Sequence, residues 1–344
     1  MTVRSSKAPT LEGRGIRVIH WLHAQGAQRA KRRGIGRVAA NLSWASWMTL
    51  WFGSQASRNR LRAVGRLWRW QLSRRVMKRP ILIELPLGGE LLCPVWSSLG
   101  GELAAVGFHA APEITMFISD VLRRGDVMVD VGANIGVYSI TAALRGATVI
   151  AFEPTARAAS ALRQSSRING CASRVSVYEL ALADFDGSAG FTIGHDVDDH
   201  LVGDSSSGRN VAVRRLDTFL AEKPLSEPIA LIKIDVEGTD IDVLRGARQV
   251  IESDRPCLIV EAWDGGFEIR RFLRNLNFGI YGYNSSNRML EEVPADFAGQ
   301  ADFIAVHDFE LSRRQTALKQ GPNSRPRLPR VHWSMADDTE EFVS

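Results

Sequence analysis

The chain is poor in cysteine and has no long apolar run. Its 344 residues include only Cys93, Cys171 and Cys257, and none of them forms a C-x-x-C pair. An odd number of isolated cysteines does not suggest a disulfide framework, so a reducing compartment is the natural interpretation. No stretch reaches the roughly 18–20 apolar residues of a membrane span, and the first residues lack the apolar segment of a signal peptide. We therefore expect a cytoplasmic protein.

Acidic residues are almost absent from the first 80 positions. Glu12 is the only acid there, against eighteen lysines and arginines, so this segment carries about +17. Because the whole chain carries +5, the remainder carries about −12. The same segment holds six of the nine tryptophans. This asymmetry predicts a basic helical arm, which we place at residues 1–79, on an acidic domain.

Two parts of this arm have the periodicity of amphipathic helices. The first would place four apolar side chains on one face: Trp44, Trp47, Met48 and Trp51. The second would separate an apolar face from a basic one: Leu61, Val64, Trp68 and Leu72 against Arg62, Arg66 and Arg69. Tryptophan and arginine at this spacing are typical of a helix at a membrane surface. Three interpretations are open: helices packed on the domain with solvated arginines, residues 40–80 on an anionic membrane, or contact with nucleic acid.

The rest of the chain is organised around residues 127–155. An apolar run ends at Asp130, a glycine turn follows, and after a stretch with helical spacing a second apolar run ends at Glu153. This order predicts strand, turn, helix and strand. Gly132 and Gly136 let backbone approach backbone or ligand without a Cβ, and Asn134 tolerates left-handed dihedrals. Glu153 stands where a nucleotide-binding unit carries an acid for a ribose diol.

The turn lacks the G-x-G-x-x-G pattern, because its three positions hold Gly132, Asn134 and Val137. A pyrophosphate needs the closer approach that three glycines allow, whereas a cofactor with a ribose and a carboxylate but no phosphate does not. S-adenosylmethionine fits that description. An ordinary strand-turn-helix with a chance pair of glycines is the alternative that these residues leave open.

Strands and helices alternate from residue 127 to residue 306, which predicts an α/β fold with a doubly wound, mostly parallel, Rossmann-like sheet. We place this domain at residues 80–310, opened by a hairpin around Gly88 and Gly89, and a disordered tail at 311–344. Four successive strands or their turns end in an acid: Asp130, Glu153, Asp235 and Glu261. Because ligands bind at the carboxyl ends of strands in such sheets, this row of acids predicts a site.

Taken together, residues 125–263 resemble the FkbM family of S-adenosylmethionine-dependent methyltransferases. The stretches that carry the resemblance follow the family's order: VDVGANIG (129–136), FEP (152–154), ALAD (181–184), KIDVEG (233–238) and LRGA (244–247). Asp240 departs from the pattern, since the family usually has a glutamate there, and this leaves its role in doubt. The resemblance implies a class I methyltransferase fold, S-adenosylmethionine as cofactor, and methylation of a hydroxyl, often on a sugar of a polysaccharide, glycolipid or antibiotic.

The expected cofactor-binding residues come from these motifs: Asp130, Gly132, Asn134, Gly136, Glu153, Ala181 and Asp235. A sugar hydroxyl is a poor nucleophile and needs a base. Asp235 is the first candidate, Glu237 the second, and His195 or His200 in the polar loop 194–210 the third. Asp235 could instead cap the following helix, and the histidines could be plain loop residues. Asp235, Glu237 and Glu261 could hold Mg²⁺ through oxygen ligands, but their spacing does not demand a metal and we expect none.

Three other functions are open. A nicotinamide-dependent oxidoreductase would use the same unit, although the glycine pattern counts against it. A non-catalytic protein docked by its arm on RNA or membrane would not need charged strand ends. Nucleic-acid methylation is disfavoured because the domain that carries the site is acidic and repels phosphates. We therefore expect a glycan-like acceptor in the cytoplasm, with the arm allowing a peripheral position on the inner face of the membrane.

Overall fold

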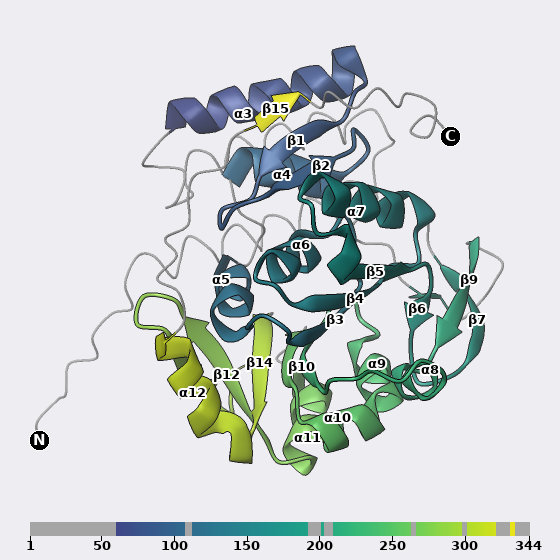
Figure 1. Ribbon diagram of the computed structural model, residues 1–344, viewed down its shortest axis with the longest axis vertical. Helices are drawn as coiled ribbons and strands as arrows, with labels where there is room; N and C mark the ends of the chain where they lie inside the picture. The colour runs from purple at the N-terminus through teal and green to yellow at the C-terminus, as the bar shows by residue number, and fades with distance from the viewer. Residues whose placement is uncertain are drawn as a thin grey trace, which may run out of the picture.

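An eight-stranded sheet forms the centre of the protein (Figure 1). The computed structural model describes residues 60–106, 112–191, 201–202, 209–262, 266–297, 301–320 and 331–333. The strand order is β13-β12-β14-β11-β10-β3-β4-β5. The bounds are β3 Val127–Val131, β4 Thr148–Phe152, β5 Val175–Tyr178, β10 Ile229–Ile234, β11 Cys257–Ala262, β12 Phe278–Asn284, β13 Met289–Glu292 and β14 Ala301–His307.

The sheet is mostly parallel. Strands β5, β4, β3, β10 and β11 pair in parallel, while β14 runs antiparallel between β11 and β12. The chain builds outward from β3 to β5 and then crosses back to β10 on the other side of β3. The carboxyl ends of β3 and β10 therefore form a topological switch point, where such sheets bind ligands. The predicted doubly wound, mostly parallel, Rossmann-like sheet is confirmed.

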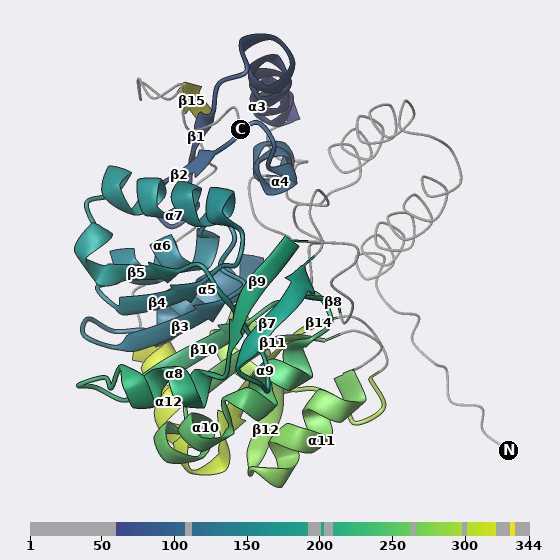
Figure 2. The same ribbon diagram turned by 90° about the vertical axis from the view of Figure 1, so that its right-hand side faces the viewer.

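Helices cover both faces of this sheet (Figure 2). One core contains the helices α5 (Pro112–Val121), α6 (Val137–Leu144) and α7 (Ala156–Ile168). The other contains α8 (Leu216–Glu222), α9 (Asp240–Gly246), α10 (Arg248–Asp254) and α11 (Phe267–Asn275). Strand β10 shows why its sequence is almost continuously apolar, since Leu231 enters the first core and its neighbour Ile232 enters the second. A strand buried on both faces needs apolar residues at both alternations.

A hairpin precedes the sheet, as the Gly88-Gly89 signal predicts. Strands β1 (Ile81–Glu84) and β2 (Glu90–Cys93) pair antiparallel. Side chains of helix α7 and its C-cap accept hydrogen bonds from backbone N–H groups on the free edge of β2. Ser165 Oγ accepts from the Leu92 N–H at 3.0 Å, and Asn169 Oδ1 accepts from the Glu90 N–H at 2.8 Å. These side chains occupy an edge that would otherwise be open to pairing with another chain.

The segment after residue 310 is not the uniformly disordered tail that its composition predicts. Helix α12 (Leu311–Gln320) contacts α5, and Leu318 is fully buried in the first core. Strand β15 (Val331–Trp333) pairs with β1. The prediction of disorder from residue 311 was wrong for these two elements because their partners lie far away in the sequence.

Helix α3 (Arg60–Leu72) packs against α4 (Ser98–Val106). The face of α3 that is buried differs from the apolar face identified from periodicity. Trp70 is buried, and its ring lies so close to Gly100 that a Cβ there would come within 2.9 Å of it. Arg66 is also buried, whereas Trp68 is 67% exposed. Among the three interpretations of the arm, the one in which the Trp68 face packs on the domain and Arg66 is solvated was therefore wrong for this helix. The helix expected around Trp44–Trp51 lies outside the described residues. Among the helices that the structure describes, none combines the length and the hydropathy of a membrane span.

Candidate functional site

The structure brings the four predicted acids to one edge of the sheet. Asp130 lies on β3, Glu153 directly follows β4, Asp235 directly follows β10, and Glu261 lies on β11. These strands are neighbours in the sheet, so their carboxyl ends meet at the switch point. This convergence is the outcome that the row of strand-end acids predicts.

The glycine turn is built for close approach of backbone to backbone. Gly132 and Gly136 have φ values of 74° and 101°, in the left-handed region that favours glycine. A Cβ on Gly132 would overlap the carbonyl oxygen of Asp235, and a Cβ on Gly136 would overlap the Leu162 side chain. Asn134 takes the left-handed conformation with φ 48°. The turn therefore seats β3 against the loop after β10 in a way that residues with side chains would prevent.

Glu153 fixes this turn from the end of β4. Its Oε2 accepts from the Asn134 N–H at 2.9 Å, and its Oε1 accepts from the Thr155 N–H at 2.8 Å. Burial raises the pKa of Glu153, while the N–H groups of Thr155 and Asn134 favour its charged form. Each carboxylate oxygen has two lone pairs. The Thr155 hydroxyl also bonds to this carboxylate, so Glu153 can hold the turn and still accept a further hydrogen bond from a ligand.

Asp130 carries a buried oxygen that no described residue satisfies. Its Oδ2 accepts from the Ser139 hydroxyl at 2.6 Å, but its Oδ1 has no hydrogen-bond partner in the described part of the chain. Burial raises the pKa of Asp130, opposed by the Lys233 charge and the Ser139 hydrogen bond. A buried acceptor without a donor is costly. The Oδ1 atom is thus a place where a donor from a bound molecule would be favourable.

Lys233 is the buried cation of the site. Its Nζ lies 2.7 Å from Asp235 Oδ2 and 4.9 Å from the centre of the Tyr138 ring. Burial acts to lower the pKa of Lys233, but the charges of Asp235 and Asp130 outweigh burial and raise the pKa above its ordinary value. The side chain is therefore charged at neutral pH. No role was predicted for Lys233, although a lysine inside an otherwise apolar strand is a visible signal in the sequence.

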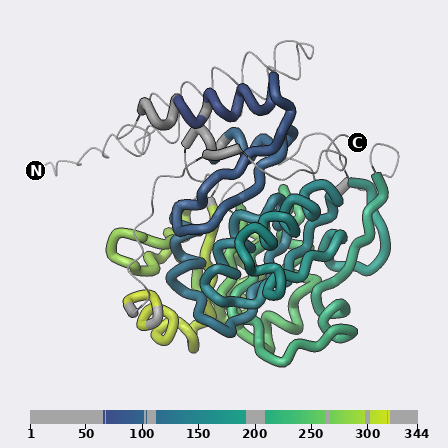
Figure 3. The backbone as a smooth tube through the Cα atoms, turned by 45° about the horizontal axis from the view of Figure 1, so that its top comes forward, coloured from purple at the N-terminus to yellow at the C-terminus, as the bar shows by residue number. Residues whose placement is uncertain are grey.

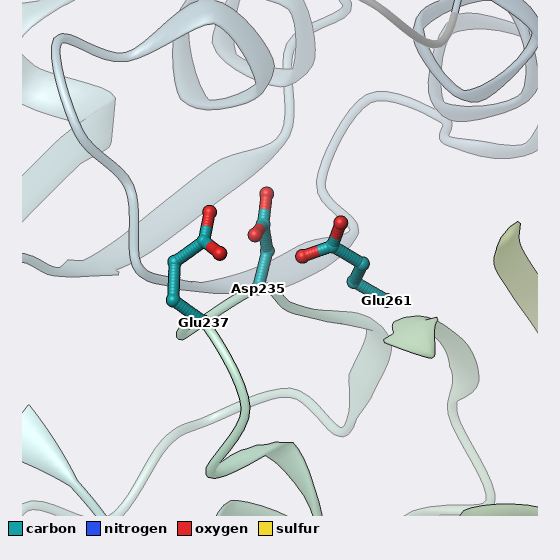
Figure 4. A group of neighbouring side chains, drawn as sticks. All are labelled: Asp235, Glu237 and Glu261. Carbon is teal, nitrogen blue, oxygen red and sulfur yellow. The ribbon is translucent and has the colours of Figure 1, made fainter. Parts of the chain in front are cut away.

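Three carboxylates face one another at this edge of the sheet (Figure 4), and Asp235 among them contacts Lys233. Asp235, Glu237 and Glu261 each offer an oxygen, and these oxygens lie within 4.8 Å of one another. Glu237 has a left-handed backbone with φ 56°, which turns the loop after β10 toward the cluster. Carboxylate oxygens are ligands that Mg²⁺ and Ca²⁺ accept. The same oxygens can instead accept a proton or hydrogen bonds from a substrate.

Asp240, the residue that departs from the family pattern, closes the loop after β10. Its carboxylate accepts from the Val236 N–H at 3.3 Å and the Gly238 N–H at 3.2 Å. The side chain is almost fully buried at the start of α9. Burial raises the pKa of Asp240 to about 6, and the charge of Asp235 adds to the shift. Its contacts are structural: the short acid holds the loop that carries Asp235 and Glu237.

Replacing Asp240 with asparagine is expected to stabilise the protein near pH 7 but not near pH 4. The folded-state pKa of Asp240 lies above the unfolded value. The contribution of Asp240 to the free energy of unfolding is therefore complete below about pH 4 and is lost as the pH rises through about 6. The relative gain of D240N over this window should reach at most about 3 kcal/mol. Urea unfolding of both proteins from pH 4 to pH 7 measures it. A variant less stable than the wild type at pH 7 would show that the two N–H contacts outweigh burial.

The other predicted residues are placed less centrally. Ala181 opens β6 (Ala181–Leu182) in a small sheet with the order β6-β9-β7-β8. It follows β5, whose last residue Tyr178 accepts the Glu153 N–H at 3.0 Å. The remaining bounds are β7 Gly187–Phe191, β8 Leu201–Val202 and β9 Arg209–Arg214. His195 and His200 lie outside the described residues, so their role as a base stays a prediction.

The residues of this site lie within a range that matches a known protein-family model. Residues 130–280 match the family model described as the methyltransferase FkbM domain. This part of the chain is similar to the FkbM methyltransferase domain. The matched range begins at Asp130 and contains the glycine turn, Glu153, the Asp235–Glu237 loop and Glu261. The resemblance inferred from the ordered motifs is confirmed.

Relatives of the FkbM domain align over part of their length. The 31-O-demethyl-FK506 methyltransferase FkbM of Streptomyces tacrolimicus is 34% identical, over 36% of this chain and 60% of that protein. Methyltransferase 1 of Beauveria bassiana is 29% identical, over 35% of this chain and 57% of that protein. The chain therefore spans less than two thirds of the length of the curated relatives it matches.

Two solved structures named as methyltransferases align with part of the chain. The methyltransferase FkbM of Methylobacillus flagellatus aligns with a TM-score of 0.37 at 19% identity, covering 55% of this chain and 46% of that one. A SAM-dependent methyltransferase of Agrobacterium tumefaciens aligns with a TM-score of 0.38 at 10% identity, covering 67% of this chain and 70% of that one.

Proposed function

We propose that this protein is an S-adenosylmethionine-dependent O-methyltransferase whose acceptor is a hydroxyl, of the kind found on sugars of polysaccharides, glycolipids or secondary metabolites. The observation that carries the proposal is the junction of the glycine turn with Glu153 at the switch point, beside a cluster of carboxylates. The turn and Glu153 suit the cofactor, and the carboxylates suit deprotonation of a hydroxyl. The Streptomyces tacrolimicus relative, named as a methyltransferase of 31-O-demethyl-FK506, supports an oxygen acceptor.

The residues at the turn fit this cofactor. Glu153 keeps acceptor capacity for a ribose hydroxyl, and Asp130 Oδ1 is a buried acceptor suited to an ammonium group. Asp130 and Glu153 would thus hold the two ends of the cofactor. The acids also match a molecule that carries positive charge, because the sulfonium and ammonium groups are both cationic.

The same turn is unsuited to a pyrophosphate. The N–H groups of Gly132 and Ala133 both donate to the Phe152 carbonyl, and the Asn134 N–H donates to Glu153. The Ile135 N–H donates to Asn134 Oδ1, and the Gly136 N–H donates to the Ala133 carbonyl. Phosphate-binding turns direct such N–H groups at the ligand. This commitment of all five turn N–H groups within the protein disfavours a nicotinamide dinucleotide as the alternative.

The chemistry follows from the charges beside the turn. When bound, S-adenosylmethionine supplies an electrophilic methyl group on a sulfonium. Asp235 takes the proton of the acceptor hydroxyl as the oxygen–methyl bond forms and the sulfur–methyl bond breaks. Lys233 holds the Asp235 carboxylate in place by its 2.7 Å contact. Holding the two reactants in line accounts for much of the acceleration such transfers require.

Replacing Glu153 with alanine should weaken S-adenosylmethionine binding roughly tenfold to a hundredfold, because charge-assisted hydrogen bonds contribute about 1.5–3 kcal/mol. Isothermal titration of the wild type with S-adenosylmethionine and with NAD tests the cofactor first. Glu179→Ala is a matched control, since this exposed glutamate follows the adjacent strand β5 and pairs only at the surface with Arg163.

Thermal unfolding without ligand separates recognition from folding, because Glu153 also fixes the Asn134 N–H. A folded E153A protein with unchanged affinity, or a wild type that binds NAD and not S-adenosylmethionine, would remove the basis for the assignment.

A further inference from the structure

The segment from Arg66 to Pro80 is positively charged, and the proposed methyl transfer assigns it no role. Its inner side is anchored, since Arg66, Trp70 and Ser73 are buried, and Trp70 lies against Gly100 and Gly101 of α4. The Ser73 hydroxyl donates to the Arg79 carbonyl, and the Lys78 N–H donates to the Ser73 carbonyl at 2.7 Å. The chain that follows α3 is thus held in one place by buried contacts.

The outer side of this segment combines positive charge with exposed apolar groups. Six consecutive residues after Ser73 are exposed, and we call residues 74–79 the basic turn: Arg74, Arg75, Val76, Met77, Lys78 and Arg79. Val76 is 70% exposed and Met77 is 41% exposed. No acid in the described part of the chain forms an ion pair with the four cations. Figure 3 shows α3, in purple, at the periphery beyond the β1–β2 hairpin.

Trp68 extends the same outer side along α3. Trp68 and Trp70 are two positions apart, which on an α-helix is a rotation of about 200° around the axis. Trp68 therefore points away from α4, against which Trp70 is buried. Its side chain is 67% exposed. Arg74 is six positions further along the chain, which is roughly 9 Å along a helix axis. An indole ring, two aliphatic side chains and four cations therefore lie within one short, anchored segment.

We propose that Trp68 and the basic turn form a docking surface for an anionic lipid bilayer. The four cations match anionic headgroups, and the exposed tryptophan, valine and methionine match the boundary between headgroups and acyl chains. A nucleic acid would use the cations but would leave Val76 and Met77 in water. Trp68 belongs to the apolar face identified from periodicity, but Arg66 of the predicted basic face is buried, so the cations of the docking surface come from residues 74–79 instead.

The test uses the full chain and vesicles of phosphatidylcholine with phosphatidylglycerol in equal parts, compared with vesicles of phosphatidylcholine alone. We expect binding to the anionic vesicles that falls steeply as salt is raised. The variant R74Q/R75Q/K78Q/R79Q should bind at least tenfold more weakly, since each basic residue near such a surface contributes roughly fivefold. The control R124Q/R167Q/R271Q/R274Q removes the same charge from exposed arginines elsewhere and should bind nearly as the wild type.

A second readout follows insertion itself. A fluorescent label at V76C should shift to shorter wavelength on anionic vesicles, whereas a label at F185C should not. The native cysteines are all buried, so labelling is directed to the new site. Equal loss of binding in both quadruple variants, or binding of duplex nucleic acid with no binding of vesicles, would overturn the proposal. Vesicle binding needs no cofactor, so its result does not depend on the proposed methyl transfer.

Discussion

Replacing Asp235 with asparagine is expected to lower turnover roughly 10²–10⁴-fold, the usual range for loss of a general base, with affinity for S-adenosylmethionine changed only a few-fold. Asparagine keeps the shape of the side chain and an oxygen that can still accept from Lys233. It removes the ability to take a proton from the acceptor hydroxyl. The measurement is turnover at saturating cofactor with an acceptor found by screening sugars and glycolipids, alongside titration of the cofactor.

Glu237→Gln and Glu261→Gln are the controls for this prediction. Both residues share the carboxylate cluster with Asp235, and Asp235 makes the 2.7 Å contact with Lys233. We expect each to lower turnover much less than D235N does. Turnover should also persist in a strong chelator. Loss of activity on chelation would reassign the three acids as metal ligands, and normal turnover by D235N would place the base elsewhere, with Glu237 and His195 next.

The sheet and its switch point could be predicted because their signals are local in sequence. Asp130, the glycine turn and Glu153 lie within one strand-turn-helix-strand unit, and each apolar run shows where a strand ends. The acids at the strand ends could be predicted to meet because parallel strands share one carboxyl edge. Strand-end position thus placed Asp235 and Glu261 beside Asp130 without knowledge of any side-chain contact.

The orientation of α3 could not be predicted, because it depends on a distant partner. Periodicity identifies candidate faces, but Gly100 and Gly101 decide which one is buried by leaving room for the Trp70 ring. Composition likewise favours disorder after residue 310, yet Leu318 is fully buried in the core beside α5. A few apolar side chains in a polar segment are a weak sequence signal, and their burial depends on long-range packing.

The role of Lys233 also depends on long-range register. It lies directly opposite Asp130 on β3, and helix α6 brings Tyr138 over its ammonium group. The sequence places Lys233 only two positions before Asp235, which shows that both point to one side of the strand. Burial and the second carboxylate, which make the lysine the counter-charge of the site, require the assembled sheet.

Replacing Lys233 with methionine is expected to destabilise the protein by about 3–5 kcal/mol near pH 8, the usual cost of removing one partner of a buried ion pair. The variant leaves the carboxylates of Asp130 and Asp235 without their cation. Protonation would relieve this repulsion, so the deficit should shrink as the pH falls toward 4. Urea unfolding across this range measures the effect, and K233R, which keeps the charge, should recover part of the stability.

A double-variant cycle separates the pair from simple loss of packing. If Lys233 acts through Asp235, the variant K233M/D235N should be more stable near pH 8 than the sum of the single changes predicts, by about 1 kcal/mol or more. Turnover adds a readout that a purely structural role would not move. Without the cation that favours the Asp235 carboxylate, the acidic limb of the pH–turnover profile of K233M should move to higher pH, and K233R should return it toward the wild type. Additive stabilities with an unmoved profile would show that Lys233 only fills space between the sheet and Tyr138.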